Sequence, residues 1–140
     1  MAIWYLDTSA FLKLLVAEEH SAALRRHVRS LELWSSTLLA VEAHRAAPRL
    51  GLDPDIVARA LSTITIVVPS ETTYSSARTV GVPELRTLDA LHLASALEFG
   101  ADLAGVLTYD RRLAAGCEHE RIEVETPGLR PSWWKQSQPR

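Results

Sequence analysis

The stretch Ile3-Trp4-Tyr5-Leu6-Asp7-Thr8-Ser9 places four apolar residues directly before an aspartate and two hydroxyl residues. A continuous apolar run with aromatic and β-branched members, ended by turn- and cap-forming residues, is typical of a strand buried on both faces of a parallel sheet. Asp7 then lies at the carboxyl end of the strand, the edge where open α/β sheets bind ligands. Taken alone, Asp7 or Thr8 is more simply interpreted as the N-cap of the helix that follows.

The composition indicates one ordinary globular domain. The chain has 140 residues, and a hydrophobic content of 47% with six glycines excludes a disordered or collagen-like chain. Its net charge of −2 arises from 15 Lys+Arg and 17 Asp+Glu, which does not mark a nucleic-acid binder but allows local fields of either sign. The single cysteine, Cys117, excludes an intramolecular disulfide and a multi-cysteine zinc site, which fits a reducing compartment.

The hydropathy pattern argues against a membrane protein. No uninterrupted apolar stretch approaches the ~18 residues that span a bilayer. Asp7 also interrupts the N-terminal apolar run too early for a signal peptide. We therefore expect a cytoplasmic protein without membrane association.

Strand-like and helix-like segments alternate along the chain, which predicts a parallel sheet covered on both faces. Further strands are expected at 31–35, 64–68, 103–108 and, at an edge, 122–124. Helices are expected at 9–15, 21–29, 38–45, 55–61, 71–79, 88–99 and 111–115. Thr8 and Thr87 are expected to cap the first and sixth of these helices. We expect one domain over residues 1–126 and a tail over 127–140 that is loosely held or contacts a partner.

Four carboxylates lie in or beside these apolar segments: Asp7, Glu42, Asp89 and Asp110. Asp7 and Asp110 each follow a predicted strand, so they share one edge of a parallel sheet. Asp89 lies in the first turn of a helix, where the partial positive charge tolerates a carboxylate, and Glu42 has Arg45 one turn on as a possible ion-pair partner. An unpaired buried charge is costly, so the four acids need an explanation.

The spacing leaves two explanations open. Either each carboxylate has its own arginine or cap and the four are scattered, or they converge and share a hard divalent cation. A cluster of oxygen ligands suits Mg²⁺ or Mn²⁺ rather than zinc, which prefers histidine or thiolate.

The segments that carry these acids resemble, in order and spacing, the four acidic motifs of PIN-domain ribonucleases, and within that family the VapC toxins of bacterial toxin–antitoxin pairs. The segments are Leu6–Ala10, Val41–Arg45, Leu88–Ala94 and Leu107–Asp110, within a likeness that covers Ile3 to about Val124. The resemblance implies an α/β fold, a three-layer α/β/α PIN-like domain with a central parallel sheet of four to five strands.

The same resemblance implies a metal-dependent endoribonuclease that acts as the toxin of a toxin–antitoxin pair. Carried over by position, Asp7, Glu42, Asp89 and Asp110 take the catalytic and metal-binding roles, with Mg²⁺ or Mn²⁺ as the cofactor. Supporting polar roles go to Thr8, Ser9 and Thr108. The implied partners are an RNA substrate, a small antitoxin of the VapB type and a second copy of the chain in a homodimer.

An RNA substrate also requires cationic side chains that counter phosphate repulsion near an acidic pocket. The candidates are Arg25, Arg26, Arg29, Arg86, Arg111 and Arg112. Arg111 and Arg112 are the strongest because they directly follow Asp110, and we predict these two, with Arg86, as RNA-binding residues. The alternative for each is an exposed helix charge. His92, on the same helix as Asp89, is interpreted as a packed, hydrogen-bonded histidine rather than a general base.

Other classes of protein fit less well. A phosphatase of the haloacid dehalogenase type needs a second acid two residues after Asp7, where the chain has Ser9. A phosphoreceiver needs a lysine late in the sheet, and the only lysines are Lys13 and Lys135. The remaining alternative is a non-catalytic protein of the PIN fold that binds an antitoxin or RNA.

Overall fold

β1 (Ile3–Leu6) is the central strand of a five-stranded sheet with the order β3-β2-β1-β4-β5, in which every neighbouring pair runs parallel. The other strands are β2 (Glu32–Ser36), β3 (Thr65–Val67), β4 (Leu103–Leu107) and β5 (Val124–Glu125). The computed structural model describes residues 1–136.

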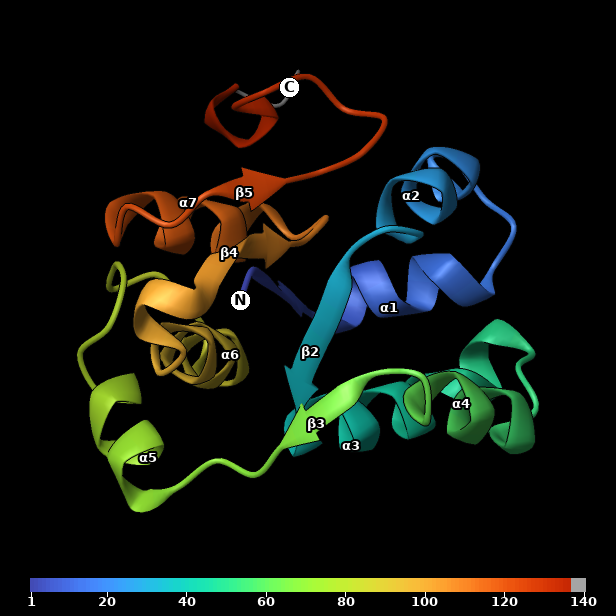
Figure 1. Ribbon diagram of the computed structural model, residues 1–140, viewed down its shortest axis with the longest axis horizontal. Helices are drawn as coiled ribbons and strands as arrows, with labels where there is room; N and C mark the ends of the chain where they lie inside the picture. Colours follow the sequence, from blue (N-terminus) through green and yellow to red (C-terminus); the bar gives the residue numbers. More distant parts are fainter. Residues whose placement is uncertain (137–140) are drawn as a thin grey trace.

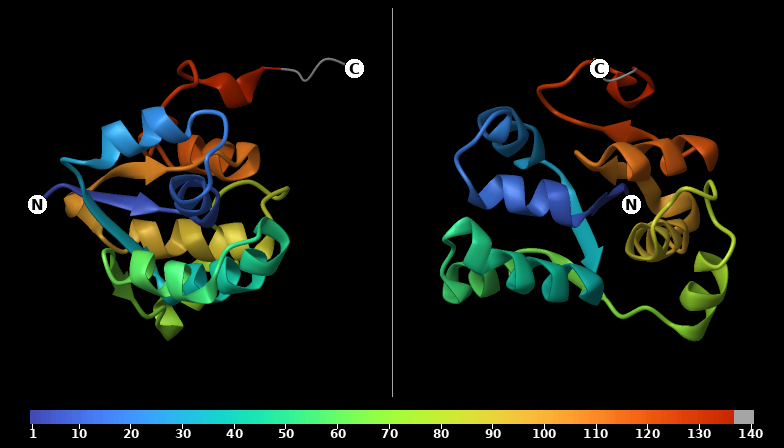
Figure 2. Two further views of the ribbon diagram at one scale, coloured as in Figure 1. Left: turned by 90° about the vertical axis from the view of Figure 1, so that its right-hand side faces the viewer. Right: turned by 180° about the vertical axis from the view of Figure 1, so that it is seen from behind.

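Helices cover both faces of this sheet. They are α1 (Thr8–Leu15), α2 (Ser21–Val28), α3 (Thr37–Ala46), α4 (Pro54–Leu61), α5 (Glu71–Ala77), α6 (Thr87–Leu97) and α7 (Arg111–His119). Short 3₁₀ turns follow at η1 (Ala47–Leu50), η2 (Gly100–Asp102) and η3 (Trp133–Lys135). Helices α1 to α4 lie on one side of the sheet and α5 to α7 on the other (Figures 1 and 2). The predicted three-layer α/β/α architecture with a central parallel sheet is confirmed.

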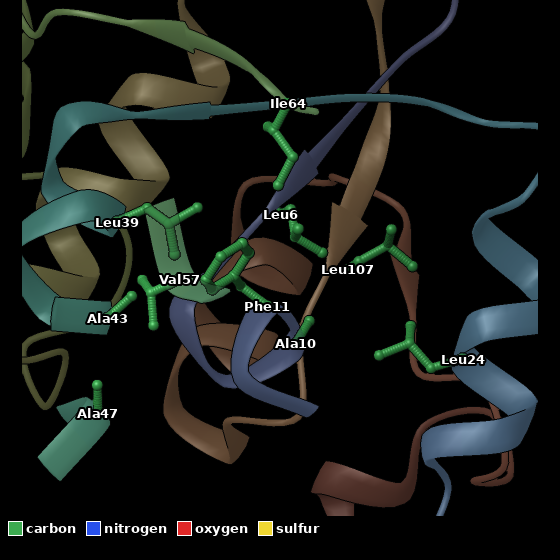
Figure 3. Packing of buried hydrophobic residues seen from close by; sticks show 10 residues of the cluster. All are labelled: Leu6, Ala10, Phe11, Leu24, Leu39, Ala43, Ala47, Val57, Ile64 and Leu107. Carbon is green, nitrogen blue, oxygen red and sulfur yellow. The ribbon is translucent and has the colours of Figure 1, made fainter. Parts of the chain in front are cut away.

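Alternation along β1 divides the core into two clusters. Leu6 points into the cluster built with α1 to α4, where Phe11, Leu39 and Val57 converge on it (Figure 3). Tyr5 points into the other cluster, with Leu93 of α6. Each large apolar side chain that is fully buried contributes about 1.5–3 kcal/mol to folding, so both helix layers are held firmly onto the sheet.

The first helix begins one residue earlier than the sequence pattern predicts. Asp7, not Thr8, is the N-cap of α1, and its carboxylate accepts a hydrogen bond from the backbone N–H of Ala10. Arg86 likewise occupies the N-cap position of α6 in place of Thr87 and makes no side-chain capping bond. A cap can shift by one position whenever neighbouring residues are all polar, because each can adopt the extended backbone that an N-cap requires.

The last helix is longer than predicted and the last strand starts later. Gly116 packs closely against Leu85 and Leu93, and Cys117 is buried, so tertiary contacts extend α7 to His119 beyond the single turn that local sequence predicts. The backbone N–H of Ile122 then bonds the carbonyl of Cys117, which delays β5 to Val124.

Part of the predicted tail packs against the end of the domain. Trp133 Nε1 donates to Thr126 Oγ1 at 2.9 Å, and Trp134 Nε1 donates to Glu118 Oε2 at 2.8 Å. Residues 137–140 lie outside the described residues, and the domain boundary at residue 126 stays a prediction. Within residues 1–136, we find no helix that combines the length and apolar character needed to cross a bilayer.

Candidate active site

The order of the strands creates a topological switch point at the carboxyl ends of β1 and β4. After β1 the chain builds β2 and β3 on one side, and it then returns to place β4 and β5 on the other side. Ligands of open α/β sheets bind in the crevice at such a point. Leu6 pairs with Leu107 at the ends of these strands. Asp7 and Thr108, which directly follow the two strands, therefore lie beside each other there.

Asp7 is fixed in this crevice by three donors. Its carboxylate accepts hydrogen bonds from Ser9 Oγ at 2.8 and 2.9 Å, from the N–H of Ala10 at 2.9 Å and from Thr108 Oγ1 at 2.6 Å. Burial raises the pKa of Asp7 despite these bonds, since the side chain is only 3% exposed. Asp7 is therefore both the cap of α1 and a buried carboxylate of the crevice.

Ser9 and Thr108 join the turn after β4 to the start of α1. The N–H of Tyr109 donates to Ser9 Oγ at 2.9 Å, and the N–H of Asp110 donates to Thr108 Oγ1 at 3.0 Å. The two hydroxyl oxygens are 3.4 Å apart. The predicted supporting residues thus hold Asp7 and set the backbone that carries Asp110.

Glu42 reaches the same region from α3. Its Oε1 accepts a hydrogen bond from Thr8 Oγ1 at 2.9 Å and lies 2.5 Å from His92 Nε2. Burial by itself raises the pKa of Glu42, but the hydrogen bond and charge of His92 and the bond from Thr8 outweigh it, so this pKa lies below its ordinary value. Within residues 1–136 the ion-pair partner of Glu42 is His92, and the possible pairing with Arg45 is not found.

Asp89 and Asp110 form the less constrained side of the acidic site, which consists of Asp7, Glu42, Asp89 and Asp110. Asp110 is the N-cap of α7, and its Oδ1 accepts from the N–H of Leu113 at 3.0 Å. Asp89, in the first turn of α6, has no side-chain hydrogen bond within the described residues. Burial raises the pKa of Asp89 to about 6, and the negative charges of Asp110, Asp7 and Glu42 add to this effect against the opposing charge of His92.

The four carboxylates therefore lie close enough for their charges to interact. In residues 1–136, however, no three Asp, Glu, His or Cys side chains are already arranged as a set that could hold a metal ion. The donor chemistry fits a hard divalent cation, because all four groups supply carboxylate oxygens. Besides burial, the negative charges of the neighbouring carboxylates raise the pKa of Asp89, and a cation bound there would oppose those charges.

A family model of the PIN domain matches residues 4–118. This chain belongs to the PIN-domain family. Two similar curated proteins come from Mycobacterium tuberculosis. Ribonuclease VapC46 is 40% identical over 129 residues, covering 91% of this chain and 99% of the relative, and Ribonuclease VapC47 is 36% identical over 132 residues, covering 89% and 96%.

Solved structures share this PIN-domain fold at low sequence identity. Mycobacterium tuberculosis VapC20, described as a Sarcin-Ricin loop cleaving toxin, superposes with a TM-score of 0.69 at 16% identity over 91% of this chain and 99% of its own. A toxin–antitoxin complex from Klebsiella pneumoniae gives a TM-score of 0.66 at 19% identity over 88% and 96%. At these identities the likeness supports the fold.

The three predicted RNA-binding arginines of this PIN domain differ in their surroundings. Arg111 Nη1 donates to the carbonyl of Trp134 at 2.9 Å and to that of Gln136, and its guanidinium lies 5.6 Å from the ring centre of Trp133. Arg112 and Arg86 are exposed, and they lie two and three residues along the chain from Asp110 and Asp89, respectively. Arg112 and Arg86 are thus the more accessible cations, whereas the tail engages Arg111.

Sequence reasoning missed the part that Tyr5 plays beneath the acidic site. Its hydroxyl donates to Ser36 Oγ at 3.1 Å and lies 2.7 Å from His92 Nδ1. His92 is packed and hydrogen-bonded, as predicted, with 2% exposure. The available signal was a tyrosine hydroxyl on the α6-facing side of β1 together with a histidine inside an otherwise apolar helix, because buried polar groups need partners.

Proposed function

We propose that this PIN-domain protein is a metal-dependent endoribonuclease and the toxin of a toxin–antitoxin pair. The curated relatives named ribonuclease VapC, 36–40% identical over nearly their whole length, support the ribonuclease assignment. The toxin–antitoxin complexes among the solved structures support the partner. The observation that carries the proposal is the group of interacting carboxylates at the switch point, with the raised pKa of Asp89.

Asp7, Glu42, Asp89 and Asp110 would hold Mg²⁺ or Mn²⁺ in this acidic site. When bound, such a cation supplies Lewis-acid chemistry: it polarises the phosphoryl group and offsets the negative charge that develops there. The chain's own residues hold the acids in place. Thr8 fixes Glu42, whereas Ser9 and Thr108 fix Asp7. Arg112 and Arg86 would oppose the charge of the RNA backbone.

A covalent cysteine mechanism is not supported. Cys117 is fully buried, and burial raises the pKa of its thiol. The thiolate is the nucleophilic form of cysteine, so a buried thiol with a raised pKa is inert. Hydrolysis by water, with the acids as the working groups, is the chemistry that the acidic site can support.

A cleavage assay on the purified protein tests the proposal. We expect Asp89→Asn and Asp110→Asn each to lower the rate of RNA cleavage at least about 100-fold, because loss of a metal-binding group should cost at least as much as loss of its supporting residues. Chelation should stop cleavage by the wild type, and Mg²⁺ or Mn²⁺ should restore it. Asp55→Asn is the matched control, since Asp55 is an exposed aspartate in the first turn of α4.

Two outcomes of this assay would contradict the proposal. Equal cleavage by wild type and both variants in the presence of chelator would remove the acidic site from the reaction. RNA binding without cleavage under any divalent cation would indicate instead the non-catalytic PIN-fold module that binds RNA or an antitoxin.

The same proposal includes a small antitoxin of the VapB type, a homodimer and a cytoplasmic location, where RNA is accessible. Co-expression with a small protein encoded beside this gene should yield a stable complex that suppresses cleavage. Light scattering of the protein alone should give the mass of two chains. A monomer at working concentration would contradict the dimer, and failure of that neighbouring protein to bind would contradict the antitoxin assignment.

A further inference from the structure

We propose that His92, whose Nδ1 is held by the hydroxyl of Tyr5, is the positioning residue of Glu42. With Thr8 it fixes one oxygen of this carboxylate and leaves the other for the ligand of the acidic site. The inference rests on the proposed function, in which Glu42 binds a divalent cation.

A buried chain of hydrogen bonds connects three elements of the fold to Glu42. It starts at Ser36, at the N-terminus of α3, passes through the hydroxyl of Tyr5 on β1 and continues to His92 on α6. Exposure is 0% for Ser36, 0% for Tyr5 and 2% for His92. Buried polar side chains are hydrogen-bonded with few exceptions, and this chain ends on the partly exposed carboxylate of Glu42, whose side chain is 24% exposed, rather than on another core residue.

The hydrogen-bond partners fix the orientation of the imidazole ring. The hydroxyl of Tyr5 lies 3.1 Å from Ser36 Oγ and 2.7 Å from His92 Nδ1, so it holds the ring nitrogen that faces away from Glu42. This contact points Nε2 at Glu42 Oε1, 2.5 Å away. The edge-on packing of the Tyr5 and His92 rings, with centroids 5.7 Å apart and planes at 70°, also restrains the ring. His92 therefore meets Glu42 in one orientation.

The two oxygens of Glu42 consequently have different surroundings. Oε1 accepts a hydrogen bond from Thr8 Oγ1 and lies within hydrogen-bond distance of His92 Nε2, whereas within the described residues no hydrogen bond reaches Oε2. In metal sites, ligating carboxylates are themselves hydrogen-bonded, and loss of such outer partners typically costs 10–100-fold in metal affinity or activity. Oε2 is thus the oxygen presented to a cation, and Oε1 is the anchor.

The first test is the affinity of the metal-free protein for Mn²⁺, measured by electron paramagnetic resonance of the free ion. Tyr5→Phe keeps the ring and its packing but removes the partner of His92 Nδ1, and we expect it to weaken Mn²⁺ binding about 10-fold. Tyr74→Phe is the control, because it removes the hydroxyl of an exposed tyrosine on α5 that, within residues 1–136, makes no hydrogen bond to His92 or to the four carboxylates. The control should bind Mn²⁺ as the wild type does.

The second test reads the ring directly through the ¹⁵N resonances of His92 in the metal-free protein. Tyr5→Phe and Glu42→Gln should each shift these resonances, whereas Tyr74→Phe should leave them in place. A merely structural role for Tyr5 predicts lower stability with unchanged Mn²⁺ affinity.

The outcomes separate this inference from the proposed function. Wild-type protein that binds Mn²⁺, with Tyr5→Phe binding it within twofold, overturns the positioning role alone. Wild-type protein that binds no Mn²⁺ overturns the metal-dependent function and this inference with it. If Glu42→Gln leaves the ¹⁵N resonances of His92 unchanged, the inference is also overturned, because the ring would then not contact that carboxylate.

Discussion

The two sides of the acidic site are built differently. On one side, hydroxyls, a backbone N–H and a histidine already hold Asp7 and Glu42. On the other side, Asp110 has one backbone partner, and Asp89 has none within residues 1–136 and has a raised pKa. Burial also raises the pKa of Asp7, but hydrogen bonds partly offset that effect, whereas the side chain of Asp89 has no hydrogen bond within residues 1–136 to offset its burial and the neighbouring negative charges. We therefore expect the hydrogen-bonded carboxylates to contribute more to the stability of the metal-free protein than Asp89 does.

The largest expected effect is the change in the free energy of unfolding when Asp7 or Asp89, one from each side, is replaced by alanine. Asp7→Ala removes the cap of α1 and leaves Ala10 N–H and Thr108 Oγ1 without their acceptor. We expect a loss of about 2–4 kcal/mol in the free energy of unfolding, from the cap and the unsatisfied donors together. Asp89→Ala should cause no loss in metal-free protein. Urea unfolding with chelator measures both, and equal losses would abolish the distinction between the two sides.

The next effect is the pH dependence that Asp89 gives to the free energy of unfolding. The pKa of Asp89 is about 6 in the folded protein against an ordinary value of 3.8, so the folded state holds this proton more tightly than the unfolded chain. Its contribution to the free energy of unfolding therefore falls as the pH rises from 3.8 to about 6, and the loss persists above that range. Asp89→Asn lacks this loss.

After allowance for solvent screening of a half-exposed group, metal-free Asp89→Asn should exceed the wild type by about 1–2 kcal/mol at pH 7. The two proteins should approach each other near pH 4. Thermal or urea unfolding with chelator across this range gives the comparison. A variant that is less stable than wild type at pH 7 would show that Asp89 is structural.

The smallest effect contrasts Arg111 with its neighbour Arg112. Arg111→Ala removes the bonds to the tail carbonyls and the contact with Trp133, and should cost about 1 kcal/mol. Arg112→Ala should stay within about 0.5 kcal/mol. RNA affinity should show the reverse order, with Arg112→Ala lowering the salt slope of binding by about one. Fluorescence anisotropy at several salt concentrations measures this slope, and equal slopes for the two variants would contradict the contrast.

Much of the fold follows from local patterns in the sequence. The continuous apolar run before Asp7 predicts a strand buried on both faces of a sheet, and the structure confirms this strand over Ile3–Leu6. The end of α7 was not predictable in the same way. Gly116 is a poor helix former, yet the helix continues through it because a residue without a side chain lets Leu85 and Leu93 approach closely.

The candidate site shows the same limit. The shared edge of Asp7 and Asp110 follows from the parallel sheet, so sequence reasoning could place both. The contact between Tyr5 and His92 joins residues 87 apart in the chain, and no local pattern encodes which way a side chain within an apolar segment will turn. Likewise, the engagement of Arg111 by residues 134 and 136 depends on how the tail folds back.

Anomalous diffraction from crystals soaked in Mn²⁺ tests most directly whether the two sides form one site. We expect a single strong peak from one Mn²⁺ ion that is coordinated by Asp89 and Asp110 and also by Glu42 or Asp7. This peak should disappear in Asp89→Asn. A peak elsewhere on the protein, or a peak in the acidic site that persists unchanged in Asp89→Asn, would contradict the assignment of these carboxylates to one metal-dependent ribonuclease site.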